Sequence, residues 1–268
     1  MCAEGAAKGW HERNGGNLSY RIDKSDIKDV RESLNENGSW CELGLCVPDL
    51  AGEYFMVTGT GKYFKNVAKD PENNIGIVRL NKTGDKYKVV WGLKDGSKPT
   101  SELSSHIMNL SVCKKRDEDI RVVYHCHPAN LTALTFVLPL DEEIFTRELW
   151  EMISECPMFL PDVIGIVPWM TPGGKEIADA TAGIMKTRDA AVWAHHGLFV
   201  CGKDFDSAFG LAETIEKASE ILVKVLSMSD RKRQTISPDN LRSLNDSLGI
   251  HLDERFLYEK NSQIIGEK

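Results

Sequence analysis

The chain has 268 residues, of which 41% are hydrophobic and 27% charged, as is typical of a globular protein with a sizeable core. Its net charge of −7 and sequence pI near 5.6 argue against a general binder of nucleic acid or of an anionic membrane. The seven cysteines show no paired CxxC spacing, the N-terminus lacks the apolar segment of a signal peptide, and the longest nearly apolar run, 131–140, is too short to span a bilayer. We therefore expect a soluble, cytoplasmic protein with reduced thiols.

Strand-like segments recur along most of the chain. Runs rich in β-branched and aromatic residues predict strands at 18–22, 54–58, 75–80, 86–91, 121–126, 163–167, 191–194 and 198–201. The runs at 75–80 and 86–91 are joined by a short turn with glycine, which predicts an antiparallel hairpin. Residues 31–53 lack any periodicity and are expected to form an irregular loop.

Helical patterns occupy the segments between these strands. Residues 99–102 precede apolar residues at helical spacing and mark a helix start. Pro128 follows a predicted strand and is expected at the first position of a helix over 129–138. A long amphipathic helix is predicted over 204–228, and another over 237–249. Hairpins mixed with helices favour one domain in which helices cover a mixed sheet.

The stretch YHCHPAN places His125 and His127 two residues apart at the end of a predicted strand. Residues i and i+2 of a strand share a face, so both imidazoles point the same way, whereas Cys126 turns to the other face as a small buried residue. A metal centre that performs chemistry has three protein ligands and an open position. The pair His195-His196 ends another predicted strand, and one of the two is the expected third ligand; the pattern leaves open which. Hydrogen-bonded structural histidines are the alternative, and we expect that role for His11, His106 and His251.

Three polar turns indicate an anion site. Asn-Gly-Gly-Asn at 14–17 precedes a strand, Thr-Gly-Thr-Gly-Lys at 58–62 follows one, and Pro-Thr-Ser-Glu at 99–102 opens a helix. Glycine lets backbone N–H groups approach an anion, and helix N-termini attract phosphate. The turn at 58–62 fails the dinucleotide fingerprint at Phe64 and the Walker A pattern at Tyr63. Each turn alone is compatible with ordinary loop chemistry, but together they suggest a phosphorylated small substrate.

Glu102 admits two interpretations, whereas an acidic cluster further along the chain favours one. Glu102 complements the helix dipole, which stabilises a first turn by ~0.3–1 kcal/mol, or it acts as a general base beside a Lewis-acid metal. Glu148, Glu151 and Glu155 recur at helical intervals, and such a cluster is by itself most often a solvated face.

These motifs together resemble those of the class II aldolases, metal-dependent enzymes that cleave sugar phosphates. The resemblance covers residues 9 to about 250 and is carried by GWHERNGGNLS at 9–19, VTGTGKYFKNV at 57–67, WGL at 91–93, PTSEL at 99–103, HCHPANLTALT at 125–135, FTRELWE at 145–151, GIVPWMTPG at 165–173, HHG at 195–197 and KRQTIS at 232–237. The stretches FTRELWE and PWMTPG point to one branch of this family.

The resemblance implies a single-domain α/β fold over 1–268, with three α/β/α layers and a large mixed, mainly antiparallel central sheet, assembled as a homotetramer. It implies one Zn²⁺ per subunit on His125, His127 and His196. It also implies a catalytic role for Glu102, and one for Glu155 in the site of a neighbouring subunit. The phosphate and substrate contacts that it implies are Asn14, Gly16, Asn17, Thr60, Gly61, Thr100 and Ser101.

The implied activity is retro-aldol cleavage of a phosphorylated ketose. Glu102 would exchange a proton with the carbon that takes up negative charge, and it is expected to approach or bind the metal in the resting enzyme. The alternatives are a sister aldolase or a 4-epimerase on the same fold, or a non-catalytic binding module. A class I aldolase would need a Schiff-base lysine, for which Lys62 is the candidate.

Overall fold

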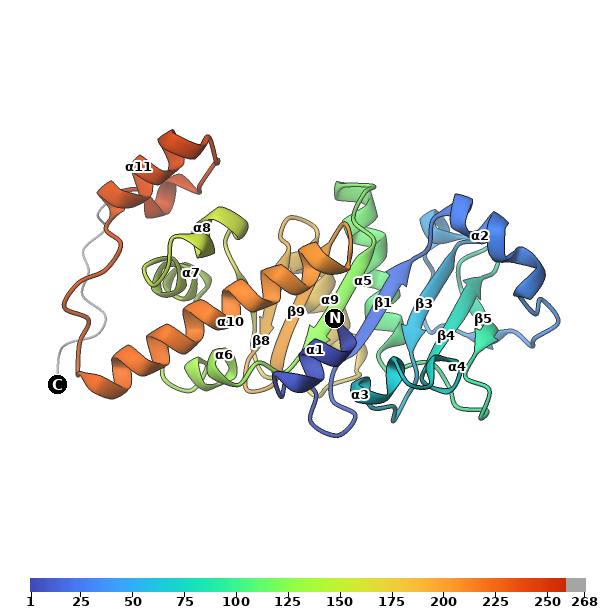
Figure 1. Cartoon of the computed structure of the whole chain (residues 1–268). Coiled ribbons are helices and arrows are strands. Elements are labelled where there is room, and N and C mark those ends of the chain that lie inside the picture. Colours follow the sequence, from blue (N-terminus) through green and yellow to red (C-terminus); the bar gives the residue numbers. More distant parts are fainter. Residues whose placement is uncertain (259–268) are drawn as a thin grey trace.

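A nine-stranded sheet is the centre of the molecule (Figure 1). The computed structural model describes residues 1–258. The strands are β1 (Asn17–Arg21), β2 (Cys41–Glu42), β3 (Tyr54–Thr58), β4 (Ile75–Leu80), β5 (Lys86–Gly92), β6 (Val122–Cys126), β7 (Gly165–Val167), β8 (Ala190–Trp193) and β9 (Gly197–Gly202), in the order β2-β5-β4-β3-β1-β6-β9-β8-β7. Within the described residues, β7 and β8 form the one parallel pair, so the sheet is mixed and mainly antiparallel, as expected.

Helices cover both faces of this sheet. They are α1 (Cys2–Ala7), α2 (Lys24–Val30), α3 (Phe64–Val67), α4 (Pro71–Asn74), α5 (Leu103–Arg116), α6 (Ala129–Leu134), α7 (Glu142–Trp150), α8 (Glu155–Phe159), α9 (Lys175–Met185), α10 (Phe205–Met228) and α11 (Pro238–Leu248). The long helix α10 crosses one face with α6, α7 and α8 beside it, while α5 and α9 pack together on the opposite face (Figure 1). The three-layer α/β/α arrangement is confirmed.

The two faces of β6 contribute side chains to two separate hydrophobic cores. Tyr124 and Cys126 lie in the core under α10, whereas Val123 lies in the core under α5 and α9. His125 shares the face of Val123, and its ring stacks on Phe199 with 4.2 Å between ring centroids. This alternation confirms that Cys126 is a buried residue on the face away from the histidines.

All eight predicted strands form, with ends shifted by no more than two residues. Strand β2 was missed, because its two residues lie in the segment expected to be irregular. The helix expected over 129–138 ends at Leu134, and Leu138 precedes Pro139, which disfavours helical backbone before it. Pro128 is the N-cap in extended conformation (ψ 124°) and not the first helical residue, so that prediction was wrong.

The C-terminal helix follows its sequence signals closely. Ser237 caps α11 by accepting a hydrogen bond from the backbone N–H of Asn240, and Gly249 ends it in the left-handed conformation. Among residues 1–258, no helix combines the length and the apolar character needed to cross a membrane. A single domain over 1–268 remains a prediction, because residues 259–268 lie outside the described part.

Candidate metal centre and active site

The candidate site lies at one end of the central strands. Strand β6 ends where β1 and β9 begin, because both neighbours run antiparallel to it: Asn17 pairs with His125, and Leu198 pairs with Cys126. A bridge between Gly59 and Pro99 joins the turn after β3 to the segment before α5. Segments far apart in the sequence therefore meet at one edge.

His125, His127 and His196 bring one ring nitrogen each to a common point. The Nε2 atoms of His125 and His196 are 3.3 Å apart, and those of His127 and His125 are also 3.3 Å apart. The three ligand atoms all lie within 4.8 Å of one another. Nitrogens at ~2.0–2.1 Å around a tetrahedral Zn²⁺ would be separated by roughly 3.3–3.4 Å, so this spacing fits a metal centre.

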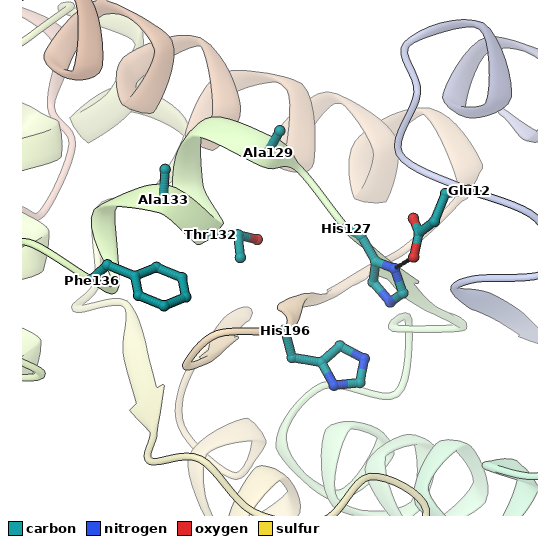
Figure 2. A pocket seen from close by; sticks show the side chains of 7 residues that line it. All are labelled: Glu12, His127, Ala129, Thr132, Ala133, Phe136 and His196. Atoms are coloured by element: carbon teal, nitrogen blue, oxygen red, sulfur yellow. Dashed lines mark hydrogen bonds and ion pairs between the residues drawn. The ribbon is translucent and has the colours of Figure 1, made fainter. Parts of the chain in front are cut away.

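The hydrogen bonds behind these rings fix their tautomers. The Nδ1 of His125 donates to the carbonyl oxygen of Leu198 at 3.1 Å, and the Nδ1 of His127 donates to Glu12 Oε1 at 2.7 Å (Figure 2). Both Nε2 atoms consequently present lone pairs to each other, an arrangement that a cation between them would stabilise. Burial lowers the pKa of His125 well below its ordinary value and that of His196 to about 4, with further lowering by neighbouring histidines, so both rings stay neutral as metal ligands require.

The turn between β8 and β9 decides which histidine of the pair joins the cluster. His195 adopts positive φ (61°), and its ring turns away to lie by Thr135 and Phe136. Gly197 is needed for close approach, because a Cβ there would lie 2.4 Å from the carbonyl oxygen of Cys126. The left-handed residue of this tight turn is thus His195.

The polar turns and the histidines line one cavity of about 170 Å³. Its lining includes every predicted site residue except Glu155: Asn14, Gly16, Asn17, Thr60, Gly61, Thr100, Ser101, Glu102, His125, His127 and His196. Among residues 1–258, no lysine or arginine lines this cavity. Lys62 lies nearby in sequence but pairs with Asp95, so its contacts give no support to a Schiff-base site.

Glu102 lies buried beside the histidines. It is the N-cap residue of α5, with 7% of its surface exposed, and it accepts a hydrogen bond from Asn17 Nδ2 at 2.7 Å. Burial raises the pKa of Glu102, while the Asn17 hydrogen bond and the charge of His127 oppose this rise. A buried carboxyl with a raised pKa is suited to acid–base chemistry. The approach of Glu102 to a bound metal remains a prediction.

The acidic cluster separates into two parts. Glu148 and Glu151 are largely buried and both pair with Lys232, so the solvated-face interpretation is wrong for these two. Glu155 is exposed at the start of α8 and lines a different cavity, of about 660 Å³, beside Glu213 and Lys217 of α10. Within this chain, Glu155 is not among the residues that line the histidine cavity.

Comparisons with known proteins show the family of the chain. The family model described as "Class II Aldolase and Adducin N-terminal domain" matches residues 1–223. The chain belongs to the class II aldolase family. A relative from Mannheimia succiniciproducens, named rhamnulose-1-phosphate aldolase, is 46% identical over 247 residues, which cover 91% of this chain and 89% of the relative. A relative of the same name from Escherichia coli O81 is 45% identical over 244 residues, with the same coverage of both chains.

Solved structures show the same fold. A sugar-phosphate aldolase from Thermotoga maritima is 29% identical and superposes with a TM-score of 0.75, covering 86% of this chain and 93% of its own. An L-fuculose 1-phosphate aldolase is 18% identical, with a TM-score of 0.57 and coverage of 93% and 94%. The second likeness concerns the fold alone.

Three polar residues that support the site of this class II aldolase escaped the sequence analysis in that role. Glu12 binds the ring of His127. His11 stacks on Phe64 at 3.7 Å and hydrogen-bonds the Tyr124 hydroxyl at 2.7 Å, beneath the 14–17 turn. His106 contacts Asn17. The available signals were the adjacency of His11 and Glu12 to the glycine turn and the spacing of His106, one helical turn after Glu102.

A second, open hollow of about 600 Å³ adjoins the histidines of this class II aldolase. His127 and His196 line it together with Glu12 on one side, and Figure 2 shows the α6 residues Ala129, Thr132 and Ala133, with Phe136 beyond them, on the other. The candidate metal centre thus lies between a cavity rich in polar donors and a hollow with an apolar wall.

Proposed function

We propose that this class II aldolase is a rhamnulose-1-phosphate aldolase, which cleaves L-rhamnulose 1-phosphate to dihydroxyacetone phosphate and L-lactaldehyde in L-rhamnose catabolism in the cytoplasm. The observation that carries the proposal is the one cavity that holds three converging histidines, a buried carboxyl and the donor-rich turns. The curated relatives of that name, about 45% identical over 91% of this chain, support the choice of substrate.

The phosphate end of the substrate is assigned to the turns of the 170 Å³ cavity. Thr60, Thr100 and Ser101 offer hydroxyl donors, and Asn14 offers a side-chain amide. Gly61 has positive φ (70°), and glycine turns of this kind let backbone N–H groups approach an anion. Donors remote from the reacting carbons orient the substrate and supply binding energy.

His125, His127 and His196 are the proposed holders of one Zn²⁺. Three imidazole donors in tetrahedral spacing suit zinc, and the same set accepts other divalent ions of the Irving–Williams series. When bound, the cation supplies Lewis-acid polarisation of the ketose carbonyl and charge stabilisation next to the breaking bond. Elemental analysis of the purified chain identifies the metal that it carries.

Glu102 is the proposed acid–base residue. Cleavage of the C3–C4 bond leaves an electron pair on C3 of the dihydroxyacetone phosphate fragment, and Glu102 delivers a proton to that carbon. In the synthetic direction, its carboxylate removes the same proton. The raised pKa of Glu102 supports this role, because the protonated form is then available closer to neutral pH.

Glu155 is the proposed partner of the C4 hydroxyl, from which it takes a proton as the aldehyde forms. Because it lines another cavity in its own subunit, this role places it in the site of a neighbouring subunit. Exposed apolar side chains at Phe136, Val137 and Trp169 support assembly, since such groups are commonly covered by partners. We propose a homotetramer with composite sites.

The test is a cleavage assay on L-rhamnulose 1-phosphate, with L-fuculose 1-phosphate and ribulose 5-phosphate as competing candidates. We expect turnover of the first substrate, its loss on chelation and its return with Zn²⁺. Glu102→Gln should lower kcat by about 100-fold or more, and His127→Ala should lose bound metal. Glu32→Gln, at an exposed position, is the matched control. Preferred turnover of either other sugar would select a sister activity, and absence of turnover on all three would favour a binding module.

A further inference from the structure

Four buried polar side chains form a continuous chain of contacts that ends at Glu102. Ser19 Oγ lies 2.7 Å from His106 Nδ1, His106 Nε2 contacts Asn17 Oδ1, and Asn17 Nδ2 lies 2.7 Å from Glu102 Oε2. Ser19 and His106 are fully buried, and Asn17 and Glu102 are 8% and 7% exposed.

The secondary structure explains why these four side chains meet. Asn17 and Ser19 are two residues apart on β1 and share the face toward α5. Glu102 and His106 are four residues apart at the start of α5 and share one face of that helix. A strand face and a helix face therefore supply two side chains each.

The carboxylate of Glu102, at the end of this series of contacts, sets the direction of every hydrogen bond in the series. An ionised Glu102 can only accept, so Asn17 donates through Nδ2 and its Oδ1 points to His106. The Nε2 of His106 must then carry the proton, and its Nδ1 accepts from the Ser19 hydroxyl. Burial lowers the pKa of His106 to about 3, in agreement with a neutral ring that has one N–H.

We propose that His106 is a positioning residue for the aldol reaction, which holds the Asn17 amide in the orientation that donates to Glu102. The proposal rests on the proposed function of Glu102. Without the N–H of His106, the Asn17 amide is free to turn over and to present its carbonyl oxygen to the carboxylate. The Glu102 carboxylate would then lose its one hydrogen-bond donor among the described residues and move away from the reacting carbon.

A pair of substitutions separates the two nitrogens of His106. The amide of His106→Gln can place an N–H donor near the former Nε2, toward Asn17, whereas the shorter amide of His106→Asn reaches only the side of Ser19. The readout is the exchange of the C3 proton of dihydroxyacetone phosphate with deuterium from solvent, followed by NMR of the small molecule. Bound metal, KM and Tm are measured on the same metal-loaded samples.

We expect His106→Asn to slow this exchange and kcat by about ten-fold or more, with bound metal unchanged and KM altered much less. His106→Gln should retain exchange within about three-fold of the unmodified chain. Equal exchange in the two variants would overturn the proposal, because a merely structural role does not distinguish them.

Two further variants complete the design. Glu102→Gln is run beside them: if it exchanges normally, the proposed role of Glu102 fails, whereas slow exchange there with equal His106 variants refutes only the role of His106. Ser19→Ala removes the donor that keeps Nδ1 of His106 unprotonated. This variant tests the proposal even if the His106 variants do not fold. Reduced exchange in Ser19→Ala supports the proposal, and unaltered exchange contradicts it.

Discussion

Glu12 lies outside the histidine cluster, yet it holds one ring of that cluster in place. Its carboxylate accepts from His127 Nδ1 at 2.7 Å, and a Cβ on Gly15 would lie 2.9 Å from both Glu12 Oε1 and that nitrogen. We predict that Glu12→Ala weakens metal affinity by about 10- to 100-fold, since partners behind a ligand orient it and raise its basicity. Competition with a chromogenic chelator measures this affinity. Glu32→Ala, at an exposed position, should leave it unchanged, and equal affinities for the two variants would contradict the role of Glu12.

At the residue scale, the sequence was sufficient where a rule of local geometry applies. Strand alternation alone places His125 and His127 on one face. His196 joins them because it directly precedes β9, the strand that pairs with β6. Glu12 and His106 act through partners that are 115 and 89 residues away in the sequence. The spacing of residues in a local sequence pattern does not indicate contacts over such separations. The sequence therefore identifies these two residues only as polar side chains near a motif.

At the scale of elements, a buried carboxylate on α10 holds the start of α6, the helix that directly follows His127 and Pro128. Glu216 Oε1 accepts from the backbone N–H and the side chain of Asn130, and Oε2 accepts from the backbone N–H of Leu131. We predict that Glu216→Gln lowers the free energy of unfolding by roughly 2 kcal/mol, because one buried N–H then faces an amide NH₂ group. Urea unfolding at one fixed protein concentration measures the change.

The control for this prediction lies one turn further along the same helix. Glu220 pairs with Lys217 and Lys224 on the solvent side, and Glu220→Gln should lower the free energy of unfolding far less than Glu216→Gln does. Equal losses in the two variants would show that Glu216 does not hold α6.

Elements with strong local patterns were predictable, and those shaped by tertiary contacts were not. The strands carry β-branched and aromatic runs, and α11 carries a Ser-Pro start and a glycine end. The residue after α6, Thr135, contacts the turn between β8 and β9, where its hydroxyl accepts from the backbone N–H of His195, 60 residues away. Strand β2 exists only through its pairing with β5. These features depend on neighbours that the local sequence does not specify.

At the scale of the whole molecule, the proposed roles of Glu102 and Glu155, which line two different cavities, predict a site shared between subunits. Glu102→Gln and Glu155→Gln are each expected to be nearly inactive on their own. When equal amounts are unfolded together and reassembled, a site at an interface regains both carboxylates where the Glu155→Gln subunit supplies Glu102 and the Glu102→Gln subunit supplies Glu155. Random assembly restores about one quarter of all sites, so we predict roughly a quarter of the activity of the unmodified protein treated in the same way. Mixing without unfolding is the control and should restore little. If reassembled mixtures stay as inactive as the separate variants, while the unmodified protein recovers, the two acids do not serve one site across an interface.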